Sequence, residues 1–145
     1  MKFSVAATLG LLTISLMGSS AIAENPAHVE QLILTGECVG CDLQGANLQN
    51  QHLIGVDLRD ANLQNADFTG SNLEGADLTG ANLTNAKLNS AFVTNASLNE
   101  ANLERVDFTA ATINDADVSG ASMLYLDLTN AQIYNTGIAV GGSEE

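Results

Sequence analysis

The sequence predicts an all-β solenoid of square cross-section, with about five four-sided coils and a short helix before them. Three observations lead to this fold class. Residues 41–140 consist of 20 consecutive units of five residues, without an insertion. The third residue of every unit is apolar, and the first is mostly alanine. A period of five matches neither the 3.6-residue period of a helix nor the two-residue alternation of a simple strand.

Each five-residue unit is best explained as one side of a square coil. The large third residue and the small first residue point inward, and the other positions, rich in Asp, Asn, Thr, Gln and Gly, face outward. Four units close one coil, so residues 20 positions apart stack on the same side. At strand spacing the coils form a shaft roughly 24 Å tall, at about 4.8 Å per layer.

The repeated pattern A-(D/N)-L-x-x, seen for example in residues 46–50 (ANLQN) and 76–80 (ADLTG), resembles the pentapeptide-repeat family. The resemblance covers all 20 units. It implies a right-handed quadrilateral β-helix with four units in each coil. The motif is specific for the fold and carries almost no information about function.

A helical cap is expected in residues 24–40, ahead of the repeats at 41–140. Asn25 is a suitable N-cap, Pro26 occupies the first helical position, and Gly36 ends the run. An apolar stripe in this segment is predicted to lie over the first coil: Val29, Leu32 and Ile33. At the other end, residues 141–145 are predicted to be a flexible tail too short to cover the last coil. A homodimer through the C-terminal coil is therefore an alternative to an exposed end.

Residues 1–23 are predicted to be a signal peptide. Lys2 provides the positive start, residues 3–17 form an uncharged apolar stretch, and residues 21–23 (AIA) form a cleavage site. An uncleaved membrane anchor is the alternative, because residues 3–23 carry no charge. Export is favoured, with no stable membrane insertion after cleavage. The resemblance suggests an exported, cyanobacterial-type member of the family, located in the periplasm or the thylakoid lumen.

The two cysteines, Cys38 and Cys41, allow three interpretations. A structural disulfide is favoured in an exported protein, and buried free thiols are the first alternative, since the repeat register turns both residues inward. A redox-active pair lacks the expected βαβ context. A metal site needs about four ligands, and beyond the cysteines only His28 and His52 offer nitrogen. We expect no metal site and no cofactor.

The chain is strongly acidic, with 17 Asp and Glu residues against four Lys and Arg. Such a surface repels nucleic acid and anionic membranes and attracts basic partners. Solubility alone is a sufficient reason for this charge. The alternative is mimicry of DNA, because some pentapeptide-repeat proteins match B-DNA in width and charge and bind a type II topoisomerase in its place. A signal peptide would take this chain away from such a target.

Five apolar residues occupy outward positions that are otherwise polar: Ile54, Phe92, Leu124, Tyr125 and Tyr134. By register Ile54, Phe92 and Tyr134 share one side, and Tyr125 follows Arg105 by one coil, at cation–π distance. Leu124, Tyr125 and Tyr134 near the last coil are the candidate interaction patch.

Two polar stacks are also predicted from the 20-residue step. One is an asparagine ladder through Asp42, Asn62, Asn82, Asn102 and Ser122. In the other, Lys87 lies between Asp67 and Asp107 and relieves their repulsion.

Catalytic residues are not expected. The sequence has no nucleophile–base constellation and no phosphate-binding glycine loop, and a packed coil leaves no pocket for a base. We therefore expect a non-enzymatic exported scaffold or protein-interaction module that binds an unidentified protein. The alternatives are the acidic DNA-mimic inhibitor and an exported redox-responsive protein that uses Cys38 and Cys41.

Overall fold

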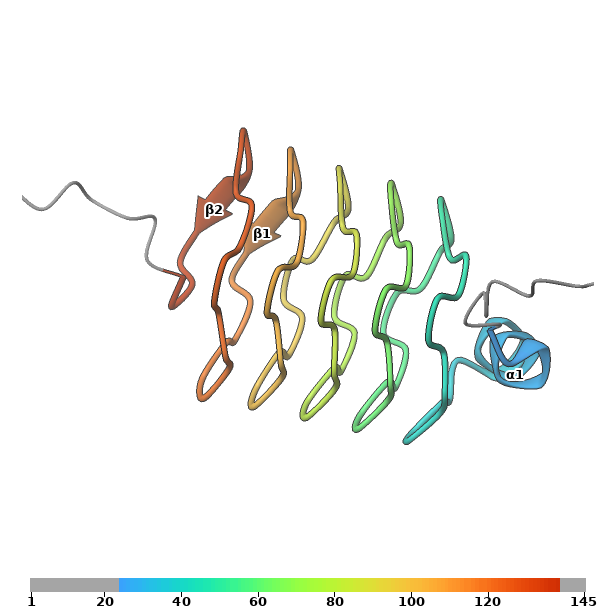
Figure 1. Cartoon of the computed structure of the whole chain (residues 1–145). Coiled ribbons are helices and arrows are strands. Elements are labelled where there is room, and N and C mark those ends of the chain that lie inside the picture. Colours follow the sequence, from blue (N-terminus) through green and yellow to red (C-terminus); the bar gives the residue numbers. More distant parts are fainter. Residues whose placement is uncertain (1–23, 139–145) are drawn as a thin grey trace, which may run out of the picture.

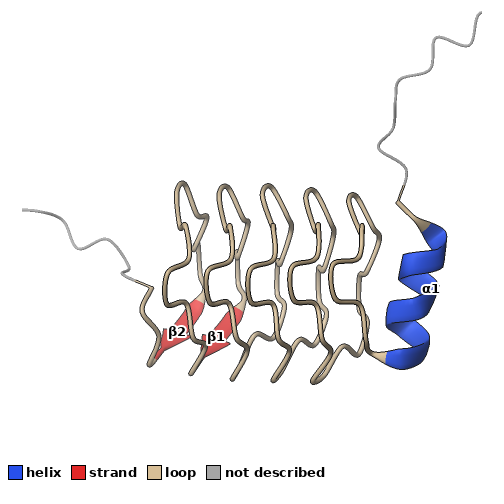
Figure 2. Ribbon diagram, turned by 90° about the horizontal axis from the view of Figure 1, so that it is seen from below, coloured by secondary structure: helices blue, strands red, loops and turns tan. Residues whose placement is uncertain are grey.

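The computed structural model describes residues 24–138. The predicted signal peptide at 1–23, residues 139–140 of the last unit and the predicted tail at 141–145 lie outside the described residues. The first element of the described residues is helix α1 (Pro26–Thr35), after which the chain winds into stacked coils (Figures 1 and 2). Strands β1 (Thr112–Asn114) and β2 (Gln132–Tyr134) lie side by side in parallel, with Ile113 opposite Ile133.

Backbone pairing between coils repeats every 20 residues. The bridges are parallel and join residues such as Glu37 and Asp57, or Asp57 and Asp77. Four units thus make one coil. Pairing begins at Glu37, inside the segment predicted to be the helical cap, because α1 ends at Thr35 and the left-handed Gly36 turns the chain into the first coil.

The inward positions form one continuous apolar core. First and third residues of the units are buried from Cys38 to Val118, except Gln51, which is partly exposed. Phe68 and Phe108 are the largest fully buried side chains. Burial of each such Leu or Phe contributes about 1.5–3 kcal/mol, which chain entropy largely offsets. In the last coil Met123, Leu126, Leu128 and Ile133 are only partly buried, because no further described coil covers them.

The fifth residue of the units adopts a left-handed backbone, which explains the glycine and asparagine found there. Positive φ angles recur at this position from Gly40 to Asn135. Glycine and asparagine tolerate this region better than other residues do. The turn is closed by the next unit, as when the Ala46 N–H donates to the Leu43 carbonyl at 3.0 Å.

The second residue of the unit caps its own turn, and this corrects the predicted asparagine ladder. Asn82 Oδ1 accepts hydrogen bonds from the Thr84 N–H at 3.1 Å and the Thr84 hydroxyl at 2.7 Å. Asp and Asn are suited to such local bonds. The predicted stack does pair through its backbone. Among the described side chains of this stack, only Asn62 donates to a neighbour, reaching Asp42 Oδ1, one coil earlier, at 3.1 Å.

Helix α1 has the predicted ends but a different buried stripe. The Asn25 side chain accepts from the Ala27 N–H, and the Gly36 N–H donates to the Leu32 carbonyl. Leu32 is buried, whereas Ile33 is 47% exposed, so the prediction was wrong for Ile33. Successive helical residues point about 100° apart, and α1 is rotated so that Leu32 rather than Ile33 is buried. Within residues 24–138, no helix is long and apolar enough to span a bilayer.

Candidate functional site

The C-terminal end of the shaft has a step on one side. On that side the bridges run through Glu37, Asp57, Asp77 and Ser97 to Asp117, and within residues 24–138 they stop there. The Leu98 N–H donates to the Asp117 carbonyl at 2.7 Å. The equivalent N–H of Val118, one coil later, has no backbone acceptor among the described residues. Within the part of the chain that the structure describes, a backbone edge is therefore open at Val118.

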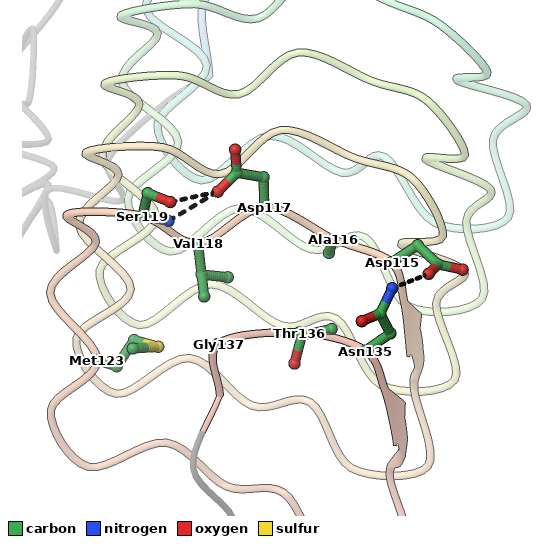
Figure 3. A pocket seen from close by; sticks show the side chains of 9 residues that line it. All are labelled: Asp115, Ala116, Asp117, Val118, Ser119, Met123, Asn135, Thr136 and Gly137. Atoms are coloured by element: carbon green, nitrogen blue, oxygen red, sulfur yellow. Dashed lines mark hydrogen bonds between the residues drawn. The ribbon is translucent and has the colours of Figure 1, made fainter.

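A cavity of about 460 Å³ lies at this step (Figure 3). It is lined by Asp115, Ala116, Asp117, Val118, Ser119, Met123, Asn135, Thr136 and Gly137. Val118 points toward Met123 and the 136–137 segment, while the Asp117 carboxylate points away on the other side of its strand. The volume falls in the range of ligand pockets. The cavity combines apolar side chains with an acidic rim.

Hydrogen bonds hold the two rim carboxylates in place. Asn135 Nδ2 donates to Asp115 Oδ1 at 2.6 Å. Asp117 Oδ1 accepts from the N–H and the hydroxyl of Ser119, at 3.0 and 2.6 Å. These bonds from Ser119 hold the pKa of the Asp117 carboxyl below its usual range. Asp117 is therefore ionised at neutral pH.

The predicted interaction patch is exposed but does not form one cluster. Leu124, Tyr125 and Tyr134 are 57%, 75% and 71% exposed. Leu124 and Tyr125 belong to the unit 121–125, and Tyr134 lies two units later, on the opposite side of a four-sided coil. The Arg105 guanidinium lies 5.4 Å from the centre of the Tyr125 ring, which confirms the predicted cation–π contact.

The cysteine pair lies between α1 and the first coil. Cys38 and Cys41 form a disulfide with a Cα–Cα distance of 5.2 Å, and both residues are buried. Cys38 Sγ lies 3.4 Å from the His28 carbonyl oxygen. The His28 ring also accepts a hydrogen bond from the Asp42 N–H at 2.9 Å. Residues 24–138 contain no group of three or more His, Cys, Asp and Glu residues arranged to hold a metal ion.

Lys87 lies between Asp67 and Asp107 in the stack, as predicted. Hydrogen bonds stabilise the Asp67 carboxylate more than the charge of Lys87 does. Lys87 pairs through the backbone with Asp67 and Asp107 and forms no ion pair among those found in the described residues. Burial alone would raise the pKa of Asp67, but hydrogen bonds from Thr69 and Gln49 lower it by more. The pKa of Asp67 is therefore below its usual value. The charge of Lys87 is the smallest of these contributions.

Charge is distributed unevenly over the four sides. The side that ends in the open edge, here called the acidic side, carries six carboxylates and one arginine: Glu37, Asp57, Arg59, Asp60, Asp77, Glu100 and Asp117. Arg59 is paired there with Asp57 at 2.6 Å and lies 3.8 Å from Asp77. The side with Asn62, Asn82 and Asn102 is nearly neutral, with Asp42, Glu104 and Arg105 as its charged residues.

Sequence reasoning missed the step and its cavity. One signal was available: the last unit, residues 136–140 (TGIAV), has Gly137 at the second position, where every earlier unit carries a side chain. Without that side chain the unit lacks the residue that caps its turn. A Cβ on Gly137 would lie 3.1 Å from Val118 Cγ2.

The repeats of this chain are similar to those of known proteins. The family model described as "Pentapeptide repeats" matches residues 41–80, 76–115, 93–123 and 101–136. A pentapeptide repeat protein of the Arabidopsis thaliana thylakoid lumen is 31% identical over 70% of this chain and 68% of its own, with a TM-score of 0.55.

Two further solved structures are similar over most of the repeats. A pentapeptide repeat protein of Nostoc PCC 7120 is 30% identical over 76% of this chain and 95% of its own, with a TM-score of 0.44. QnrB1, a plasmid-mediated fluoroquinolone resistance protein, is 20% identical over 70% of this chain and 55% of its own, with a TM-score of 0.34. No curated protein matches the chain significantly.

Proposed function

This chain belongs to the pentapeptide-repeat family, and from that premise we propose that it is a non-enzymatic, exported scaffold that binds a protein partner. Its shaft is proposed to be a right-handed quadrilateral β-helix of about five coils, which the 20-residue pairing supports. The proposed division is a leader at 1–23, a cap at 24–40, the repeats at 41–140 and a tail at 141–145. The burial of Leu32 supports the capping role of α1.

The packing of the shaft is the observation that carries this proposal. Its buried residues are apolar with the exception of Ser71, whose hydroxyl is fully hydrogen-bonded within the backbone. Side chains able to recognise another molecule therefore lie on the outer sides and at the C-terminal end of the described shaft. That arrangement suits contact with a macromolecule better than the enclosure of a small substrate.

Two observations support export. Disulfides persist in oxidising compartments, and Cys38 is bonded to Cys41. The Arabidopsis relative is a thylakoid lumen protein. We place this chain in the thylakoid lumen or the periplasm.

The test is the intact mass of the native protein from fractionated cells, before and after reduction and alkylation. We expect an extracytoplasmic species that starts at Glu24 and gains mass for two thiols only after reduction. A cytosolic species that keeps residues 1–23 and free thiols would overturn the proposal of export.

Partner contact is tested by photocrosslinking from Tyr125 and Tyr134, the most exposed aromatic residues of the last coil. A photoreactive residue at either position should capture a partner, and one at Thr84, on the nearly neutral side, serves as the matched control. Sedimentation of the purified protein identifies a homodimer through the C-terminal coil, the alternative partner.

DNA mimicry is the competing function, and the uneven charge argues against it. B-DNA presents phosphates along both strands around its axis, whereas this rod has one acidic side and one nearly neutral side. A supercoiling assay with a type II topoisomerase decides between them. Inhibition at stoichiometric concentrations would replace the scaffold proposal by the mimic.

A further inference from the structure

We propose that the open edge at residues 116–119 binds an extended basic peptide, which adds to it as a parallel strand with the pattern small–basic–apolar. This inference rests on the proposed function, because it assigns a place and a chemistry to partner binding. The peptide would pair with residues 116–119 on the acidic side, where residues 136–138 of the last unit form no backbone bridge to the edge.

The backbone of the edge supplies the docking groups. One coil earlier, the Leu98 N–H donates to the Asp117 carbonyl at 2.7 Å, and the Asp117 N–H donates to the Ala96 carbonyl at 3.0 Å. The corresponding groups of the next coil are the Val118 N–H and the Ala116 carbonyl. Neither has a backbone partner within residues 24–138. Unpaired groups of this kind are a template for strand addition.

The cavity at the step provides room beside these groups. Its volume is about 460 Å³, and Val118, Ala116 and Met123 give it an apolar floor. Gly137 faces Val118 without a side chain of its own. A small residue and a larger apolar residue of the peptide would point toward this floor, as the first and third residues of every unit do.

Charge selects the middle residue of the peptide. Asp115 and Asp117, which line the cavity beside the open edge, both carry carboxylates. The repeat itself shows how a lysine stacks in this setting: Lys87, in the unit 86–90 (AKLNS), pairs through the backbone with Asp67 and Asp107. A peptide with lysine at the same register would stack on Asp117 as Lys87 stacks on Asp67.

Charge also disfavours the other two occupants. Residues 139–145 (AVGGSEE) of this chain carry two glutamates and no basic residue. A second copy would bring the same Asp115 and Asp117 carboxylates to the contact. Like charges that meet across an interface are unfavourable.

The experiment uses the purified, oxidised protein and three labelled synthetic peptides. The first carries the sequence of residues 86–90 with one serine added before it, the second has glutamate in place of lysine, and the third is N-methylated at the lysine. Fluorescence anisotropy measures binding, and amide hydrogen exchange is followed at Val118 and at Leu98. The Leu98 amide is already bonded and is the internal control.

We expect the lysine peptide to bind saturably and to slow exchange of the Val118 amide by about tenfold or more, with Leu98 unchanged. The glutamate and N-methyl peptides should bind at least about tenfold more weakly. Asp117→Asn should weaken binding by about two- to fivefold, as loss of one exposed charge does. The matched control Asp127→Asn, which alters the same kind of turn on another side, should leave binding within about twofold.

Several outcomes would overturn the inference. One is an unchanged Val118 amide at saturating lysine peptide, and another is equal binding of the lysine and glutamate peptides. Binding that appears only after truncation at residue 138 would assign the edge to the chain's own C-terminus instead. A partner crosslinked at Tyr125 or Tyr134 without peptide binding would leave the scaffold function standing and remove this inference alone.

Discussion

The hydroxyl oxygen of Ser71 accepts a hydrogen bond of 3.3 Å from the backbone N–H of Gln51, one coil earlier. The same hydroxyl donates to the Leu48 carbonyl. In an ordinary unit the two backbone groups bond directly, as Ala46 N–H does to the Leu43 carbonyl at 3.0 Å. Ser71 therefore bridges a turn whose direct hydrogen bond is missing.

Replacing Ser71 by alanine should destabilise the protein. The Gln51 N–H and the Leu48 carbonyl would lose their bridging partner, and unpaired buried polar groups cost about 1–3 kcal/mol. We expect the free energy of unfolding, measured by urea denaturation, to fall by about 1–2 kcal/mol. In the double variant Gln51→Ala/Ser71→Ala the ordinary turn bond can form again, so the two losses should not add. Additive losses would contradict the bridge.

Two glycines with the same backbone conformation should differ in their tolerance of alanine. Gly70 and Gly75 have φ angles of 70° and 67°. A Cβ on Gly70 would lie 2.5 Å from Asn50 Oδ1, whereas a Cβ on Gly75 meets nothing within 4 Å. Gly75→Ala should cost about 1–2 kcal/mol of unfolding free energy through its left-handed backbone alone. Gly70→Ala should cost more, because Asn50 must move; equal costs in urea denaturation would refute this explanation.

Asp67 should give a pH-dependent contribution to stability. Its folded pKa is lowered, since the hydrogen bonds from Thr69 and Gln49 outweigh its burial. The contribution is therefore fully present above the unfolded pKa, about 3.9, and is lost as the pH falls through the folded value. Asp67→Asn keeps the turn acceptor and removes the charge. The stability gap between the wild type and this variant should be constant from pH 7 to pH 5 and should shrink below about pH 4; a gap that widens in acid would show the opposite sign.

The disulfide should stabilise the junction of α1 with the first coil. Closing so short a loop is worth about 2 kcal/mol in the entropy model. Reduction, or replacement of Cys38 and Cys41 by serine, should lower the unfolding free energy by about that amount. Amide exchange should accelerate at Gly36, whose N–H bonds to Leu32, before it does at Leu83 in mid-shaft. Uniform acceleration along the chain would argue against a local clamp.

The regular part of the fold was predictable because one five-residue pattern is repeated without interruption. Leu88 or Ala86 could be assigned to the core from position alone, and both are fully buried. The role of the polar residues at the second and fifth positions of each unit was harder to predict from the sequence. This role depends on the local turn, in which Asn82 bonds to Thr84 and the fifth residue is left-handed.

The two ends were less predictable than the shaft. Which of Leu32 and Ile33 faces the first coil depends on how α1 is rotated, and the helix pattern fits both. The open edge at Val118 depends on whether residues 136–138 pair, and sequence alone marks only the unusual Gly137. Leu124, Tyr125 and Tyr134 were predicted to be a patch because all three are outward apolar residues near the last coil, and they are exposed; whether they bind a partner stays a prediction.

The 20-residue step also constrains how such a protein grows during evolution. A tandem duplication of one five-residue unit would rotate every later side chain by a quarter turn. The acidic side would then be divided between two neighbouring sides, and the stack of Phe68 on Leu88 and Phe108 would fall out of phase with the later coils. A duplication of four units lengthens the rod and keeps every stripe aligned. Only growth in multiples of four units therefore preserves a surface that a partner already recognises.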